Sequence, residues 1–240
     1  MMTNTFDRHT IHRFDEELQA LHFQVMEMGE LVLNQLCLAM ESLHKKDLQL
    51  ARGIIDRERV VNEMEVSADT VVCGILVKRC PKGTDLRTVM AASRIVNNLE
   101  RIGDETVKFA NFVADIYSNR QNHESNLRLD ELFKLGASSI DILQSALEVF
   151  ERLDAVQARQ IGGLHHKLGR EFQLGLRNLM DLLQSQKTSV ADAVNQVLMM
   201  KALERIGEQA QRIAESVIFQ LEGEETLHKL PEIVQDLQIS

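Results

Sequence analysis

The sequence predicts an all-α protein of six long helices, arranged as two tandem, pseudo-symmetric three-helix bundles. Three observations support this fold class. The 240 residues include only 12 Gly and 2 Pro, about half the average share, whereas a β-sandwich or barrel needs such residues at its strand ends. Apolar side chains recur at helical spacing. Segments of the first half of the chain also recur in the second half, which indicates a duplicated unit.

The first helix is expected over residues 10–45, because apolar side chains alternate at spacings of three and four along one stripe. The stripe consists of Phe14, Leu18, Leu21, Val25, Met28, Val32 and Ala39, with Gln35 at one seam position. Asp47 is expected to cap a second helix, which continues to about Arg79 and stops at Pro81 and Gly83.

A third helix is expected to start at Thr84 or Asp85 and to end where the polar segment 118–126 breaks the apolar pattern. Its seam is formed by Ile95, Leu99, Ile102, Thr106, Phe109, Val113 and Ile116. The other three helices are predicted at residues 127–153, 154–185 and 189–221.

Two pairs of segments carry the repeat. Residues 39–54 match residues 146–161 at six of sixteen positions, with an offset of 107. The motif Leu-Glu-Arg-Ile-Gly-Asp at 99–104 returns as Leu-Glu-Arg-Ile-Gly-Glu at 203–208, with an offset of 104. The two offsets differ by nearly one helical turn. We therefore predict a first repeat at 10–119, a second repeat at 126–222 and a C-terminal tail at 223–240.

Composition excludes several classes of function. Acidic residues outnumber basic ones by 36 to 27, and the resulting field repels nucleic acid and anionic lipid. No window has the roughly 18 uncharged apolar residues of a membrane span, so a membrane role is expected only through partners. Three cysteines without zinc-type spacing, and an N-terminus without an apolar signal run, predict a reduced, cytoplasmic protein.

The third helix carries candidate metal ligands. Glu100 and Asp104 are four residues apart, so their carboxylates project from one face. Asn97 and Asn111 lie beside them on the helical projection. A solvated acidic face is the common alternative for such a pair. Recurrence of the same motif with an acid in the second repeat favours a cation site.

The second helix has a companion stripe of oxygen-bearing side chains, Glu58, Asn62, Glu65 and Asp69. If the flanks of the second and third helices meet, carboxylate and amide oxygens converge without nitrogen or sulfur. Such a set suits a hard cation such as Mg²⁺, Mn²⁺ or ferric iron.

The second repeat preserves this pattern only in part. Glu204 and Glu208 keep the acids, but Lys201 replaces Asn97. The residues at the places of Glu58, Asn62 and Glu65 are His165, Gly169 and Phe172. Three interpretations stay open: a poorer metal site, an imidazole ligand from His165, or a vestigial site.

Other chemistry is poorly supported. Glu41 with His44, and Glu225 with His228, have the Glu-x-x-His spacing of di-iron bundles. However, one pair lies at a helix end and the other in the tail. No phosphate loop and no nucleophile arrangement occurs. We therefore predict that the protein is not an enzyme.

The two Leu-Glu-Arg-Ile-Gly-acid motifs, taken together with the repeat, resemble the PhoU family of phosphate-signalling regulators. Three further stretches agree with that family, Gln24–Gly29, Val61–Val66 and Lys78–Arg87. The likeness runs from about residue 10 to 222. The family's second turn usually reads Gln-Pro, whereas this chain has Cys80-Pro81.

The resemblance implies a non-enzymatic negative regulator of the phosphate-starvation response that also limits phosphate uptake. Its partners would be the sensor histidine kinase PhoR and the phosphate ABC transporter through its ATPase PstB, and the protein would form a homodimer. The resemblance also implies multinuclear metal (Mg, Mn, Fe or Zn) at Glu/Asp-x-x-x-Asp motifs, which map to Glu100 and Asp104 and, imperfectly, to Glu204 and Glu208.

Asp85 and Arg87 are expected at an exposed turn, where they would contact a partner, although Asp85 could equally cap a helix. Two other classes of function remain open: a helical-bundle metal-storage or redox protein, and a ligand-free coiled-coil scaffold.

Overall fold

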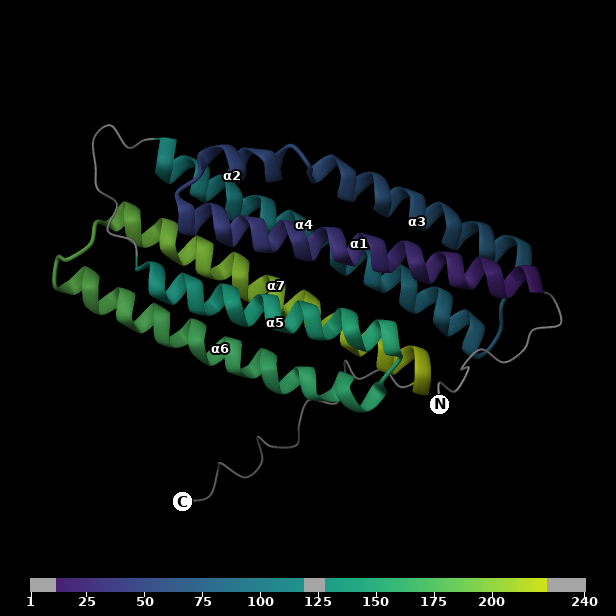
Figure 1. Ribbon diagram of the computed structural model, residues 1–240. Coiled ribbons are helices and arrows are strands. Elements are labelled where there is room, and N and C mark those ends of the chain that lie inside the picture. The colour runs from purple at the N-terminus through teal and green to yellow at the C-terminus, as the bar shows by residue number, and fades with distance from the viewer. Residues whose placement is uncertain (1–11, 119–127, 224–240) are drawn as a thin grey trace, which may run out of the picture.

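The computed structural model describes residues 12–118 and 128–223, and every regular element within these ranges is an α-helix (Figure 1). The helices are α1 (His12–Lys45), α2 (Leu48–Ile55), α3 (Glu58–Arg79), α4 (Thr84–Ser118), α5 (Leu129–Arg152), α6 (Ala155–Gln184) and α7 (Val190–Glu222). The start of the predicted first helix at 10–11, most of the polar segment at 118–126 and the tail after 223 lie outside the described residues.

The predicted pair of three-helix bundles is confirmed. Helices α1 to α4 form the first bundle and α5 to α7 form the second. The long helices α4 and α7 pack against each other, and each also packs against the other helices of its own bundle (Figure 1). The two copies of the Leu-Glu-Arg-Ile-Gly motif therefore lie on the two central helices. No helix within the described ranges is long and apolar enough to cross a bilayer.

The predicted second helix is two helices in the structure, which corrects the sequence expectation. It is interrupted at Asp56 and Arg57, between α2 and α3. There the Arg57 N–H donates to the Ile54 carbonyl and the Val60 N–H donates to Arg57. These i→i−3 bonds tighten the chain into a 3₁₀-like turn. The other five predicted helices are unbroken.

Equivalent caps start α2 and α6. The Asp47 carboxylate accepts hydrogen bonds from the backbone N–H groups of Gln49 and Leu50, at 2.9 and 3.0 Å. Asp154, 107 residues later, accepts from the N–H groups of Val156 and Gln157 at the same distances. Each cap satisfies two of the free N–H groups at a helix start. The capping predicted for Asp47 is confirmed, and it recurs in the second repeat.

The predicted apolar stripe of α1 is buried throughout, together with Gln35. The Gln35 side chain is fully buried, and neither of its amide atoms has a hydrogen-bond partner among the described residues. A buried amide without partners is destabilising. It is the one polar position within an otherwise apolar seam.

Candidate functional site

A close contact between α3 and α4 positions the first-repeat carboxylates. Gly103 has no side chain, which lets α3 pack closely against α4 at this point. If an alanine replaced Gly103, its β-carbon would lie 3.2 Å from Val61 Cγ1. Glu65 is one helical turn beyond Val61, and Asp104 follows Gly103 directly. The small motif residue thus brings the acidic flanks of two helices together.

Four carboxylates of α3 and α4 lie near enough to one another to interact electrostatically. Partial burial raises the pKa of Glu65, and the charges of Asp69 and Asp104 raise it further. Partial burial likewise raises the pKa of Glu100, with added repulsion from Asp104 and Glu65 that outweighs the opposite effect of nearby basic residues. These four residues of α3 and α4 therefore share one negative field. We call Glu65, Asp69, Glu100 and Asp104 the carboxylate face.

None of the four has an ion-pair or hydrogen-bond partner for its side chain within the described ranges. In the same ranges, no three His, Cys, Asp or Glu side chains lie close enough together to hold a metal ion. The other predicted ligands of the first repeat form no hydrogen bond with the carboxylate face in the described ranges. Those residues are the exposed Asn62, Asn97 and Asn111 and the half-buried Glu58.

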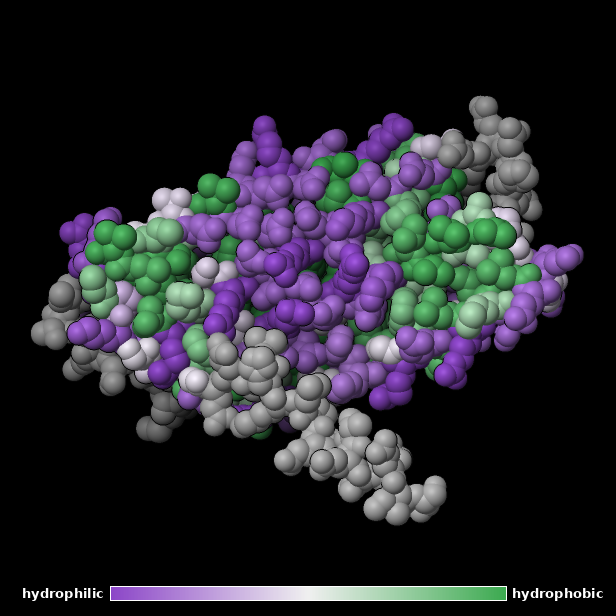
Figure 2. Space-filling view, turned by 180° about the vertical axis from the view of Figure 1, so that it is seen from behind, coloured by the Kyte–Doolittle hydropathy of each residue, from purple (hydrophilic) through white to green (hydrophobic). Residues whose placement is uncertain are grey.

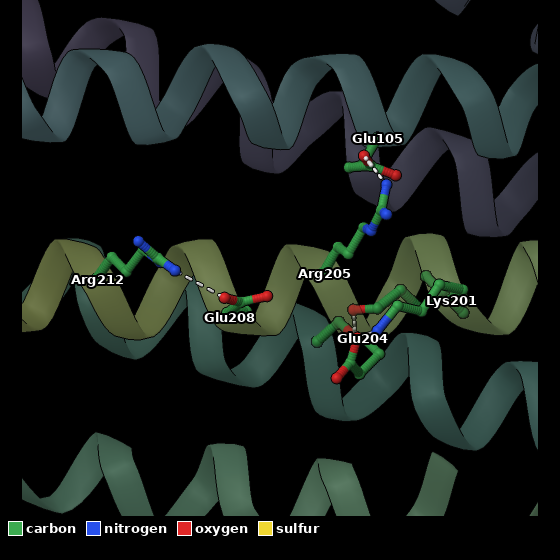
Figure 3. A network of polar contacts seen from close by, with 8 residues as sticks. Glu105, Lys201, Glu204, Arg205, Glu208 and Arg212 are labelled. Atoms are coloured by element: carbon green, nitrogen blue, oxygen red, sulfur yellow. Dashed lines mark hydrogen bonds and ion pairs between the residues drawn. The ribbon is translucent and has the colours of Figure 1, made fainter. Parts of the chain in front are cut away.

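The equivalent acids of the second repeat are already neutralised by basic residues of their own helix (Figure 3). Lys201 Nζ lies 2.6 Å from Glu204 Oε2, and Arg212 donates to Glu208 Oε1 at 2.8 Å. The hydrogen bond from Arg212 lowers the pKa of Glu208. The two repeats thus differ in charge balance, although their motifs are nearly identical in sequence.

His165 lies in the second repeat at the place of Glu58. Its ring is half-buried, and its Nε2 is enclosed without a hydrogen-bond partner in the described part of the chain. Burial lowers the pKa of His165, while the charges of Glu204, Glu208 and Glu215 act in the opposite direction. His165 therefore faces the second-repeat acids.

The structure adds a polar contact between the repeats that sequence reasoning missed. Glu105 on α4 is buried, and its Oε1 accepts from Lys108 at 3.0 Å. The same oxygen accepts from Arg205 of α7 at 3.2 Å (Figure 3). Both motifs border the cleft beside it, whose volume is about 190 Å³. The cleft is lined by Arg101, Asp104, Glu105, Lys108, Arg205, Glu208 and Gln209. Glu105 directly follows the first motif, but its partner is distant in sequence.

Asp85 and Arg87 are half-buried rather than exposed at the tip of a turn, which corrects the expectation. Arg87 Nε donates to the Gln220 carbonyl at 3.3 Å, and its guanidinium lies beside Gly223. Arg87 thereby satisfies a free carbonyl at the end of α7. In this position it joins the first turn of α4 in one repeat to the end of α7 in the other.

The Glu41–His44 pair does not form a bundle-core metal site. Glu41 pairs with Lys45, one turn further along α1, and the exposed His44 packs beside the Phe133 ring. Glu225 and His228 lie outside the described residues. A di-iron site needs two such motifs directed into one core, and the described part of the chain does not have them.

Comparisons with known proteins agree with the fold and the repeat. A family model described as "PhoU domain" matches residues 25–113 and 132–217. The chain is 32% identical to the phosphate-specific transport system accessory protein PhoU of Escherichia coli K12 over 222 residues, covering 92% of this chain and 90% of that one. The corresponding protein of Edwardsiella tarda has the same identity and coverage.

Two crystal structures are also similar. PhoU from Pseudomonas aeruginosa matches with a TM-score of 0.83 and 31% identity, over 88% of this chain and all of that one. The phosphate transport system regulatory protein PhoU from Streptococcus pneumoniae matches with a TM-score of 0.80, 24% identity and coverage of 88% and 98%. The second likeness concerns the fold alone.

Proposed function

The chain belongs to the PhoU family of phosphate transport accessory proteins, and from that premise we propose that it is a negative regulator of the phosphate-starvation response. It would act as a non-enzymatic adaptor between the phosphate ABC transporter, through its ATPase PstB, and the sensor histidine kinase PhoR. In this role it would silence the kinase when phosphate is plentiful and would limit phosphate uptake. Its contact with the membrane would go through these partners.

The observation that supports a docking role is the carboxylate face of α3 and α4. Four carboxylates share one field, two of them have raised pKa values, and no basic side chain pairs with them in the described ranges. Like charges held together without a directly paired counter-ion destabilise the folded chain. A fold keeps such an arrangement at a cost, which favours a ligand or a partner that supplies positive charge.

The donor set of the first repeat fits a hard cation. All four side chains offer carboxylate oxygens only, the ligands preferred by Mg²⁺, Mn²⁺ and ferric iron. Binding would require the side chains to rotate toward one point, because no three of them are grouped closely enough as they stand. A bound cation would supply the charge that removes their mutual repulsion.

The second repeat fits a cation less well. Its two acids already have Lys201 and Arg212 as partners. Phe172 and Leu176 replace Glu65 and Asp69 at the 107 offset. We therefore place the functional metal site in the first repeat and expect at most a weak site near His165.

A ligand-free scaffold remains the second candidate function, and one observation favours it. Gly207 contacts Leu168 just as Gly103 contacts Val61, so packing alone explains why the motif glycine recurs. Packing does not explain the acids that follow the glycines, because neither Asp104 nor Glu208 belongs to the buried core. The regulator therefore accounts for more of the repeated motif than the scaffold does.

The test is a starvation reporter in cells that lack their own copy of this protein. The wild-type chain should restore silence of the reporter at high phosphate. The triple variant Glu65→Gln, Glu100→Gln, Asp104→Asn should leave the reporter active, while a control with Glu27→Gln and Glu30→Gln on the exposed face of α1 should restore silence. A silent reporter with the triple variant would contradict a role for the carboxylate face.

A further inference from the structure

A hollow with basic side chains lies on the surface of α6, and we call it the basic hollow. It has a volume of about 640 Å³. Its lining includes His166, Gly169, Arg170, Gln173, Leu174 and Arg177. Residues 166, 170, 173 and 177 follow one another at spacings of four, three and four, so they form one stripe along the helix. Gly169 leaves space beside this stripe, because nothing lies within 4 Å of the position that its β-carbon would take.

The two arginines of the basic hollow have no acidic partner among the described residues. Arg170 and Arg177 are exposed, and neither forms an ion pair or a side-chain hydrogen bond there. Glu171 of the same helix is directed toward α5, where it pairs with Lys134 at 3.6 Å. Asp181 lies one turn beyond Arg177 but does not line the hollow. The basic hollow therefore carries an excess of positive charge.

The first repeat has no such group of cations. At the 107 offset, Arg170 and Arg177 correspond to Glu63 and Thr70. Glu63 pairs with Arg59 one turn away on α3, at 3.2 Å, so the charges of that face cancel. Since the two repeats share one fold, packing within a bundle does not require unpaired arginines on α6. Their presence in the second repeat indicates a contact outside the bundle.

The charge of the whole molecule limits what the basic hollow binds. Figure 2 shows hydrophilic side chains across the middle of one face of the molecule, and the chain carries a net charge of −9. Its overall field repels an extended polyanion such as nucleic acid or an anionic membrane. A short acidic segment avoids most of this repulsion and complements the local charge.

The chain itself has an acidic segment that begins close to α6. Residues 224–240, which lie outside the described residues, contain one lysine and four acids, Glu224, Glu225, Glu232 and Asp236. They follow Gly223, which ends α7 in a left-handed cap with a φ of 74°. At this end of α7, Glu222 pairs with Arg159 near the start of α6. The tail therefore starts beside the helix that carries the basic hollow.

The tail is long enough to reach the arginines. Arg159 precedes Arg170 by 11 residues and Arg177 by 18, which is about 17 and 27 Å along the helix axis. Glu232 and Asp236 follow the end of α7 by 10 and 14 residues, and extended chain spans about 33 and 46 Å over those lengths. Both acids can thus meet the arginines without any change in the helices.

We propose that the acidic C-terminal segment 224–240 binds the basic hollow of its own chain, with Glu232 and Asp236 beside Arg170 and Arg177. The leucines of the segment then cover Leu174, which is 52% exposed. Single ion pairs at a surface are weak, but the covalent link holds the tail at a high effective concentration. An acidic partner reaches this face of α6 only by displacing the tail. The inference rests neither on metal at the carboxylate face nor on the proposed function.

The test is the rate at which chymotrypsin cleaves the full chain after Leu227 and Leu237 at low salt, followed by the mass of the intact protein. The variant Arg170→Glu, Arg177→Glu should be cleaved in the tail at least about threefold faster than the wild type, because cleavage follows the population of released tail. High salt should remove the difference, since it screens the attraction. Helical circular dichroism should stay unchanged, because both arginines are exposed.

A charge exchange separates this contact from a general loosening of α6. Adding Glu232→Lys and Asp236→Lys to the α6 variant restores opposite charges on tail and helix, and slow cleavage should return. A helix that had merely lost its structure would not recover in this way.

The matched control is Arg52→Glu, Lys78→Glu. These exposed residues of α2 and α3 lie outside the basic hollow, and their reversal changes the net charge equally, so the control should be cleaved at the wild-type rate. Equal cleavage of the wild type and the α6 variant would overturn the proposal, as would a charge exchange that does not restore slow cleavage. Slow cleavage restored by mixing the α6 variant with a chain that carries only the two tail lysines would place the tail on a second copy and overturn the contact within one chain.

Discussion

Gly103 of α4 faces Val61 of α3 so closely that a β-carbon added at Gly103 would lie 3.2 Å from Val61 Cγ1. The same relationship recurs in the second repeat between Gly207 and Leu168, where an added β-carbon would meet Leu168 Cδ2. Val61 and Leu168 are 107 residues apart, and the glycines are 104 apart. The motif glycine therefore sets the distance between the second and third predicted helices of each repeat, and with it the spacing of the flanking acids.

Gly103→Val should destabilise the protein. Two β-branched side chains would compete for one space, and overpacking of this kind costs about 1–3 kcal/mol. Urea denaturation measures the change. Gly74→Val on α3 is the matched control, because nothing lies within 4 Å of a β-carbon at Gly74. If the Gly103 variant is no less stable than the Gly74 variant, α3 can shift away from α4 and make room for the added side chain.

The pH dependence of the metal-free protein should report the carboxylate face. The pKa values of Glu65 and Glu100 are raised above their ordinary value of 4.5. The folded chain therefore holds these protons more tightly than the unfolded chain does. Stability conferred by protonation is present below about 4.5 and is lost as the pH rises through the raised values. The ionised forms of both residues thus destabilise the metal-free protein at neutral pH.

Glu65→Gln, Glu100→Gln should accordingly raise the melting temperature of the metal-free protein at neutral pH. The rise should be small, because both groups are partly exposed and solvent screens their repulsion. The gain should disappear as the pH falls toward 4.5. Scanning calorimetry at several pH values measures it. Glu27→Gln on α1 should have no effect, and a gain independent of pH would exclude the charge explanation.

Gln35→Met should stabilise the protein. Methionine has a similar shape, and the change removes a fully buried amide whose two polar atoms have no partner in the described ranges. The expected gain is about 1–3 kcal/mol by urea denaturation. Gln196 is almost equally buried, but it accepts from the Arg128 N–H and donates to Glu131. Gln196→Met should therefore be destabilising, and equal effects at the two sites would refute the argument.

Local sequence signals predicted most of the fold. The cap at Asp47, the stop at Pro81 and the duplicated motif each depend on neighbours within a few residues, so they could be recognised in the sequence. The matching cap at Asp154 was found only in the structure. The break at Asp56 and Arg57 was not predicted, because the apolar spacing continues across it. The equivalent segment of α6 is unbroken despite Gly162 and Gly163.

The candidate site was predicted only in part. Spacing on one helix placed Glu100 beside Asp104, and the stripe of oxygen-bearing side chains on the second predicted helix pointed to Glu65. Whether an acid has a counter-ion depends on rotamers and on other helices, as Glu105 with Arg205 shows. The neutralisation of Glu208 by Arg212 was available in principle as an i,i+4 pair. Arg87 was expected at an exposed turn because its contact with Gln220 spans 133 positions of sequence.

The most direct test of the account is the metal content of untagged protein, measured by inductively coupled plasma mass spectrometry for wild type, Glu100→Gln/Asp104→Asn and the Glu27→Gln/Glu30→Gln control. We expect near-stoichiometric metal in the wild type and the control, and its loss from the carboxylate variant. Equal metal in all three proteins, or none in any of them after incubation with Mn²⁺ and Mg²⁺, would contradict a functional cation site on α3 and α4.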